Sequence, residues 1–160
     1  MSKFNISTML LLALVVAAFS QPNFSGKWKL DTEKTVVPDR GPGRMAKSLT
    51  VTQGDNKLTV DRVSTNRDGD EVTNTENYTL DGKKCVNEMR FGDRESTVQV
   101  KDNTIVITSV TKFEREGNTF EMNGTETWKL DNNGKELVID SHMETPRGDR
   151  DLTIYYSKVQ

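Results

Sequence analysis

The stretch Phe24-Ser25-Gly26-Lys27-Trp28-Lys29-Leu30-Asp31 decides the fold class, because its side chains alternate strictly between two kinds. In a β-strand, successive side chains point to opposite faces of the sheet. One face of this stretch then carries Phe24, Gly26, Trp28 and Leu30, and the other carries Ser25, Lys27, Lys29 and Asp31. The stretch predicts a strand with one face in the core and the other in solvent.

The same alternation returns along the rest of the chain, in segments separated by short turns rich in Gly, Asp and Asn. These residues favour hairpin turns, and one such turn is expected at Gly92-Asp93. The predicted strands are 24–31, 48–53, 57–64, 71–80, 85–91, 96–100, 104–113, 119–130, 137–143 and 152–158. Ten strands joined in this way predict an all-β fold, an antiparallel up-and-down barrel with little or no helix.

A short pattern (aromatic, any residue, Leu, Asp) ends three of the predicted strands, at Trp28–Asp31, Tyr78–Asp81 and Trp128–Asp131. The aromatic residue and the leucine share one face, and the aspartate starts a turn by accepting hydrogen bonds from the backbone that follows it. We interpret the repeat as a structural device in which large apolar groups close one end of the barrel. The residues assigned to that closure are Gly26, Trp28, Leu30 and Trp128. Chance repetition in a chain rich in hairpins is the alternative.

Residues 1–20 differ in composition from the rest of the chain. Lys3 precedes an uninterrupted apolar run of eleven residues, Met9 to Phe19, and Ala18-Phe19-Ser20 offers small residues where a signal peptidase reads them. A membrane anchor needs roughly 18 or more apolar residues, so the run predicts a secretory signal peptide instead. We expect cleavage before Gln21, a single domain over residues 21–160, and a periplasmic or extracellular location.

Composition and cysteine content narrow the functional classes. The net charge is −2, and removing the signal peptide takes away only Lys3, so no basic face for nucleic acid is expected. Cys85 is the single cysteine, which excludes an internal disulfide. A lone cysteine is more often a small apolar residue than a redox or intermolecular group. We expect a monomer with no membrane span.

Phe24-Ser25-Gly26-Lys27-Trp28 resembles the Gly-x-Trp opening of the lipocalin and fatty-acid-binding protein superfamily, whose members are calycin-type barrels. In that superfamily the tryptophan seals the closed end. The count of ten strands resembles the fatty-acid-binding branch. The Tyr-x-Leu-Asp-Gly-Lys and Trp-x-Leu-Asp hairpins, with the final Tyr156-x-Lys158, are similar to small exported bacterial lipocalin-like proteins of unassigned role. The resemblance implies that the barrel binds a small lipophilic or amphiphilic ligand.

The sequence departs from the fatty-acid-binding pattern at two places. The family's last strand carries Arg-x-Tyr, which clamps a carboxylate, but Ile154 stands two positions before Tyr156. The family's helical lid corresponds to Thr32–Lys47, where Pro38 and Gly41-Pro42-Gly43 oppose two helices. We therefore expect no carboxylate clamp in the last strand, and a loop at the open end of the barrel.

Strand alternation also places polar residues on the inner face. The inward set comprises Arg62, Asn74, Glu76, Asn87, Glu126 and Ser141, beside Met89, Met122 and Tyr156. Burying the three charged members would cost several kcal/mol each unless they pair or stay hydrated. This predicts an arginine–carboxylate network or a water-filled cavity, and the functional interpretation is a ligand site anchored by Arg62. The assigned ligand-binding residues are Arg62, Glu76, Asn87, Met89, Met122, Glu126 and Tyr156. The alternative is that bulges shift the register and place these charges in solvent.

The sequence shows no Gly-x-Ser-x-Gly motif, no glycine loop for phosphate and no zinc spacing, and Glu76 with Glu126 is a carboxylate pair only by conjecture. His142 is the only histidine, which excludes a multi-histidine metal site. It alternates with Leu137, Ile139, Ser141 and Met143 and so belongs to the other face. We predict no enzyme activity, no metal and no cofactor. The first alternative to ligand binding is a ligandless envelope or protein-interaction module, and haem binding through His142 is a remote third.

Overall fold

The structure, a computed structural model, describes residues 21–36, 45–89, 92–115, 117–146 and 148–160. The predicted signal peptide at 1–20 lies outside these ranges. Within them, no helix is long and apolar enough to span a membrane. The strands are β1 (Gly26–Leu30), β2 (Ser48–Gln53), β3 (Lys57–Thr65), β4 (Glu71–Thr79), β5 (Cys85–Met89), β6 (Gly92–Lys101), β7 (Thr104–Arg115), β8 (Asn118–Asp131), β9 (Glu136–Glu144) and β10 (Arg150–Val159).

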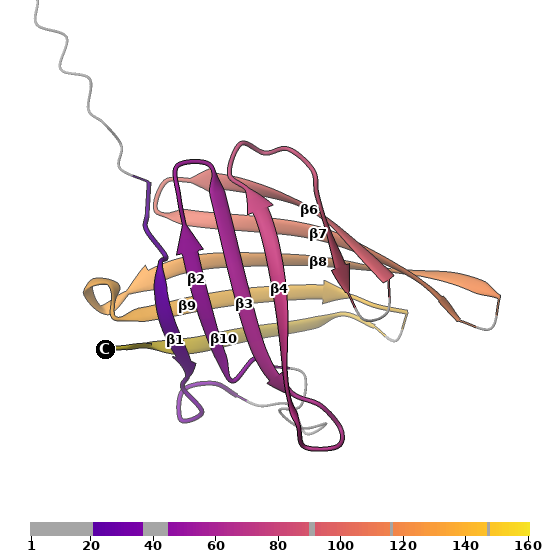
Figure 1. Ribbon diagram of the computed structural model, residues 1–160, viewed down its shortest axis with the longest axis horizontal. Helices are drawn as coiled ribbons and strands as arrows, with labels where there is room; N and C mark the ends of the chain where they lie inside the picture. Colours follow the sequence, from indigo (N-terminus) through magenta and orange to yellow (C-terminus); the bar gives the residue numbers. More distant parts are fainter. Residues whose placement is uncertain (1–20, 37–44, 90–91, 116, 147) are drawn as a thin grey trace, which may run out of the picture.

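All ten strands belong to one antiparallel sheet that curls into a nearly closed barrel (Figure 1). The order is β4-β3-β2-β1-β10-β9-β8-β7-β6-β5, so β1 joins the last strand and the sheet edges are β4 and β5. In Figure 1, β1 to β4 cross β6 to β10 at a steep angle, as the two walls of a flattened barrel. The predicted fold class is confirmed, since each pair of adjoining strands forms a ladder of the kind that alternation and short turns favour.

The prediction of a turn at Gly92-Asp93 is wrong. β6 begins at Gly92, which pairs with Met89, and it continues through Asp93 and Arg94 before the predicted start at Ser96. A Cβ atom at residue 92 would lie 2.1 Å from the carbonyl oxygen of Lys112, and φ is +138°. Glycine is needed here because the backbone of β7 passes close by. As a consequence, Arg94 lies inside a strand.

The aromatic residues singled out in the sequence lie in one continuous core. The rings of Phe24 and Trp128 meet edge to face, with centroids 6.1 Å apart and planes at 72°. Nε1 of Trp28 donates to the carbonyl oxygen of Phe24 at 3.0 Å. Burial of two indoles and a phenyl ring contributes several kcal/mol each to stability. Phe24 joins the core although β1 begins only at Gly26.

The three aspartates of the repeated pattern start turns as predicted. Oδ1 of Asp31 accepts from the backbone N–H groups of two residues that follow it, at 3.1 Å each. Oδ1 of Asp81 accepts from Lys83 N at 3.2 Å, and Oδ1 of Asp131 accepts from Asn132 N at 2.7 Å. After Asp131 the chain makes a 3-10 turn, Asn132–Gly134, which is the one helical element among the described residues. The aspartates therefore end their strands by local hydrogen bonding.

The predicted loop Thr32–Lys47 is described only at its two ends, since residues 37–44 lie outside the described ranges. At the first end, Asp31 N donates to the carbonyl oxygen of Tyr155 at 2.8 Å. At the second end, Lys47 N donates to the carbonyl oxygen of Val63 at 2.7 Å. The segment therefore leaves the barrel beside β10 and returns beside the last residues of β3.

Candidate ligand site inside the barrel

The centre of the barrel contains four charged side chains, Arg62, Glu76, Arg94 and Glu126, here termed the arginine–glutamate cluster. Glu76 on β4 is fully buried and accepts three hydrogen bonds. Arg62 Nε donates to its Oε2 at 2.7 Å, and Arg94 Nη1 donates to its Oε1 at 2.6 Å. The hydroxyl of Tyr78 donates to Oε2 at 2.9 Å. Charge-assisted hydrogen bonds of this length are the strong kind, so Glu76 fixes both arginines.

Glu126 completes the cluster from the opposite wall of the barrel. Its Oε2 accepts from Arg62 Nη2 at 2.7 Å and from Trp128 Nε1 at 2.8 Å. Cζ of Arg62 lies 5.5 Å from the centroid of the Trp128 ring, within cation–π range. Glu126 and Trp128 share a face because they stand two residues apart on β8. Arg62 therefore ties β3 to β4 and to β8.

The surroundings of Glu76 keep it ionised. Burial by itself would raise the pKa of its carboxyl group, but the charges of Arg62 and Arg94 and the Tyr78 hydroxyl outweigh burial and hold the pKa below its ordinary value. Burial raises the pKa of Tyr78, and the neighbouring Glu76 raises it further. Burial also raises the pKa of Tyr156 to about 12. At neutral pH Glu76 is thus a carboxylate, and the phenols of Tyr78 and Tyr156 are neutral.

Part of this cluster is accessible to water although its side chains face inward. The side-chain exposure is 17% for Arg62, 25% for Arg94 and 24% for Glu126, against 0% for Glu76. An inward side chain of a barrel gains exposure only if solvent reaches the interior. Solvent therefore reaches Arg62, Arg94 and Glu126, and Glu76 lies beneath this accessible layer.

Apolar side chains continue the inner face beyond the cluster, on the extended β7–β8 hairpin. The rings of Phe113 and Phe120 are stacked, with centroids 5.6 Å apart and planes at 22°. Met122 pairs with Thr111 next to them and is half-buried. Figure 1 shows this hairpin reaching past the neighbouring strands. Met89 on β5 is also half-buried, and we refer to Met89, Phe113, Phe120 and Met122 together as the apolar mouth.

The structure brings three of the predicted site residues together in one cluster. Arg62, Glu76 and Glu126 form the predicted network, so a register shift that would place them in solvent is excluded. Met89 and Met122 lie in the apolar mouth. In the strand register, Asn74 on β4 stands opposite Arg62 on β3, and Ser141 on β9 stands opposite Glu126 on β8. The role of these residues in ligand binding stays a prediction.

Tyr156 and Asn87 are engaged in structural hydrogen bonds. The hydroxyl of Tyr156 donates to the carbonyl oxygen of Ala46 at 3.0 Å. The side chain of Asn87 accepts from the backbone N–H of Asn77 at 2.7 Å and donates to its carbonyl oxygen at 3.1 Å. Cys85 Sγ accepts from Thr79 N at 3.1 Å. Side chains of β5 thus replace the missing backbone ladder between β4 and β5.

The four residues assigned to barrel closure are divided in their burial. Trp28 and Trp128 are fully buried, whereas Gly26 and Leu30 are half-buried. Nζ of Lys158 lies 5.1 Å from the centroid of the Trp28 ring. The structure therefore places both tryptophans in the core, and their function as an end seal stays a prediction.

Sequence reasoning missed two groups of this site. Arg94 was missed because Gly92-Asp93 has the composition of a turn. Arg94, Ser96 and Val98 are alternate residues of β6 and share its inner face, but the predicted strand began only at Ser96. Phe113 and Phe120 lie at or near the ends of predicted strands. Few neighbouring residues establish the alternation there, so the face of a terminal residue is hard to assign. Counting inward positions outward from Ile107 and Trp128 would have found both phenylalanines.

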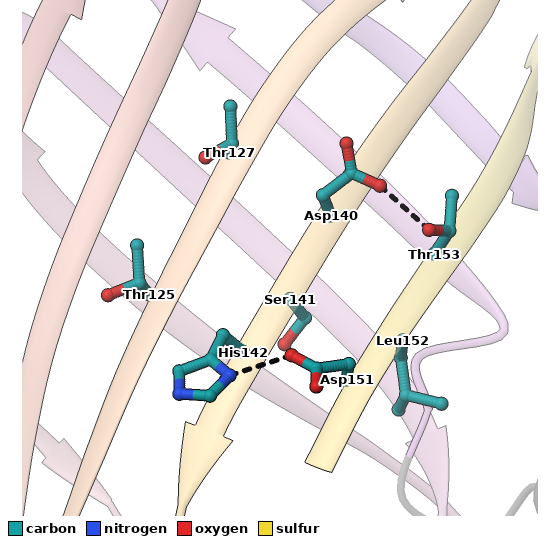
Figure 2. A pocket seen from close by; sticks show the side chains of 8 residues that line it. All are labelled: Thr125, Thr127, Asp140, Ser141, His142, Asp151, Leu152 and Thr153. Atoms are coloured by element: carbon teal, nitrogen blue, oxygen red, sulfur yellow. Dashed lines mark hydrogen bonds and ion pairs between the residues drawn. The ribbon is translucent and has the colours of Figure 1, made fainter. Parts of the chain in front are cut away.

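A pocket on β8, β9 and β10 is lined by Thr125, Thr127, Asp140, Ser141, His142, Asp151, Leu152 and Thr153 (Figure 2). There, His142 Nδ1 lies 2.7 Å from Asp151 Oδ1, and Thr153 Oγ1 donates to Asp140 Oδ1 at 2.7 Å. The hydrogen bond with Asp151 raises the pKa of His142. His142 is on the outer face, as predicted, so it does not reach a ligand inside the barrel. Among the described residues, no three His, Cys, Asp or Glu side chains are grouped to hold a metal ion.

Comparisons with known proteins show the class of fold. No protein-family model and no curated protein matches the chain. A zebrafish ileal bile acid-binding protein complexed with cholic acid matches with a TM-score of 0.56 and 18% identity, over 85% of this chain and 98% of that one. An asparagine-to-glutamine mutant of the fluorescent protein UnaG matches with a TM-score of 0.54 and 16% identity, over 85% and 96%.

The chain therefore has the fold of the calycin-type barrels, in the ten-stranded form found in fatty-acid-binding proteins. At these identities the likeness concerns the fold, and function must be argued from the site.

Proposed function

We propose that this protein is an exported barrel that binds a small lipophilic or amphiphilic molecule in the open part of its interior. The observation that carries the proposal is the partial exposure of Arg62, Arg94 and Glu126, which face inward. The similar bile acid-binding protein was solved with cholic acid, which supports ligand binding by this fold.

The arrangement of apolar and polar groups fits an amphiphilic molecule. The apolar mouth would cover the lipophilic part, and each Å² of apolar surface removed from water contributes roughly 25 cal/mol. The cluster below it would orient the polar part through a few directed hydrogen bonds, as ligand pockets commonly do. Arg62 is the proposed anchor, because it is accessible and held in place by two carboxylates.

Export is the second part of the proposal, and it is supported by the apolar run before Gln21. N-terminal sequencing of the protein recovered from the periplasm or the medium should begin at Gln21. Recovery of the uncleaved chain from the cytoplasm alone would contradict export.

Binding is tested with Nile red, a neutral dye whose fluorescence rises in apolar surroundings. We expect saturable binding to the wild-type protein, and a loss of about tenfold or more in affinity for Met122→Glu, which places a charge in the apolar mouth. Thr119→Glu is the matched control, since Thr119 is exposed on the outer face of the same strand, and should bind like the wild type.

Native mass spectrometry of the protein purified from its source extract should show a bound small molecule. If no species remains bound and neither Nile red nor other apolar dyes bind, the ligandless scaffold becomes the better explanation.

A further inference from the structure

The arginine–glutamate cluster is electrically balanced at neutral pH, with two guanidinium groups and two carboxylates. Each arginine already has a carboxylate partner, at 2.7 Å for Arg62 and 2.6 Å for Arg94. Glu76 is fully buried and saturated by three donors, so a ligand meets the layer above it. A ligand carboxylate entering this layer would be a third negative group, and the four side chains of the cluster hold no third cation to balance it.

The accessible layer offers hydrogen-bond donors and an acceptor side by side. Arg62 uses Nε and Nη2, and Arg94 uses Nε and Nη1, of the five N–H groups that each guanidinium carries. The bonds that hold Glu126 both end on its Oε2. Its Oε1 is therefore the acceptor oriented away from these partners. A negative group bound next to it would meet like-charge repulsion.

We infer that the ligand of this barrel carries an uncharged polar group with both a donor and an acceptor, such as a carboxamide, where a fatty acid would carry a carboxylate. The inference rests on the proposed function and names the ligand class for the same site. An uncharged group needs no counter-charge, and it matches the donors of Arg62 and Arg94 together with the acceptor of Glu126. Glu126 is thus a specificity-determining residue, because its charge balances Arg62 and repels anions.

The test compares two ligands with the same alkyl chain, dodecanamide and dodecanoate, as competitors of Nile red at neutral pH. We expect the amide to displace the dye from the wild-type protein at a concentration about tenfold or more lower. This comparison requires no variant, so it does not depend on whether a mutant folds. Equal or better displacement by dodecanoate would overturn the inference.

Glu126→Gln sharpens the test, since glutamine keeps an oxygen for Arg62 and Trp128 but removes the negative charge. Affinity for dodecanoate should rise about tenfold or more, while affinity for dodecanamide should change little. The matched control is Glu121→Gln on the outer face of the same strand, where Glu121 pairs with Lys112 at 3.3 Å, and it should change neither affinity.

The two proposals fail in different ways. If neither competitor nor Nile red binds, the proposed function fails and the inference falls with it. If both competitors bind with equal strength and Glu126→Gln does not favour dodecanoate, only the inference is wrong.

Discussion

The barrel interior has a packed part and an open part, and both are built from the same strands. On β3, Leu58 and Val60 are fully buried, whereas Arg62, the next inward residue, is partly accessible. On β8, Trp128 is fully buried and Met122, on the same face, is half-buried. Stability therefore concentrates in the packed part, and the open part is free to carry accessible polar and apolar groups for binding.

The packed part should show the largest loss on truncation. Trp28→Ala should lower the free energy of unfolding by about 3 to 5 kcal/mol, because it leaves a cavity in the core and removes the bond to Phe24. Urea unfolding followed by circular dichroism measures this loss. Val86→Ala on an exposed position of β5 serves as the control and should change stability by about 0.5 kcal/mol or less. A loss below about 1 kcal/mol for Trp28→Ala would contradict the placement of Trp28 in the packed core.

The arginine–glutamate cluster lies between the packed part and the open part. Breaking it should give the next largest loss of stability. Glu76→Gln leaves Arg62 and Arg94 without their shared carboxylate, and we expect a loss of about 2 to 4 kcal/mol in urea melts. This loss is smaller than the loss expected on breaking a wholly buried ion pair, because solvent reaches both arginines. Unchanged stability would mean that the cluster does not join the walls of the barrel.

Glu76 should also make the stability of the fold depend on pH. The pKa of Glu76 is lower in the folded protein than its ordinary value of 4.5, so its contribution is complete above about pH 4.5. The contribution is lost as the pH falls through the folded-state pKa. Stability curves of the wild type and Glu76→Gln, measured against pH, should therefore converge in the acid range. Parallel curves would contradict an ionised Glu76 paired with arginine.

The open part should separate stability from binding. Met122→Ala should cost about 1 kcal/mol or less in stability, since the side chain is only half-buried, but it should weaken Nile red binding several-fold. Urea melts and dye titrations of the same preparation measure both quantities. A large loss of stability without a change in affinity would assign Met122 to the packed part.

The outer face should show the smallest effect. The hydrogen bond that His142 makes to Asp151 raises the pKa of His142, so this contact stabilises the fold below the ordinary histidine pKa and is lost as the pH rises through the higher folded value. A titration followed by nuclear magnetic resonance should find the His142 midpoint above the ordinary value of about 6.5. Asp151→Asn should move the midpoint back toward it, and dye binding should not change.

Local patterns predicted most of this architecture. Alternation at period two identified ten strands and the inward face of Arg62, Glu76 and Glu126, because a strand places side chains by parity alone. The turn aspartates were equally readable, since they bond to backbone within a few residues. Gly92 misled the reading of β6, because a glycine required by a close backbone approach looks the same in sequence as a glycine required by a turn.

The sequence by itself thus determined most strand and turn positions and the inward positions of Arg62, Glu76 and Glu126, all of which depend on neighbours along the chain. Only the tertiary structure decided which charges meet. Glu76 on β4 and Arg94 on β6 lie 18 residues apart, and Arg62 and Glu126 lie 64 residues apart on opposite walls. Such pairs depend on how the sheet closes, which sets the distance between strands that are remote in sequence and which no local pattern encodes.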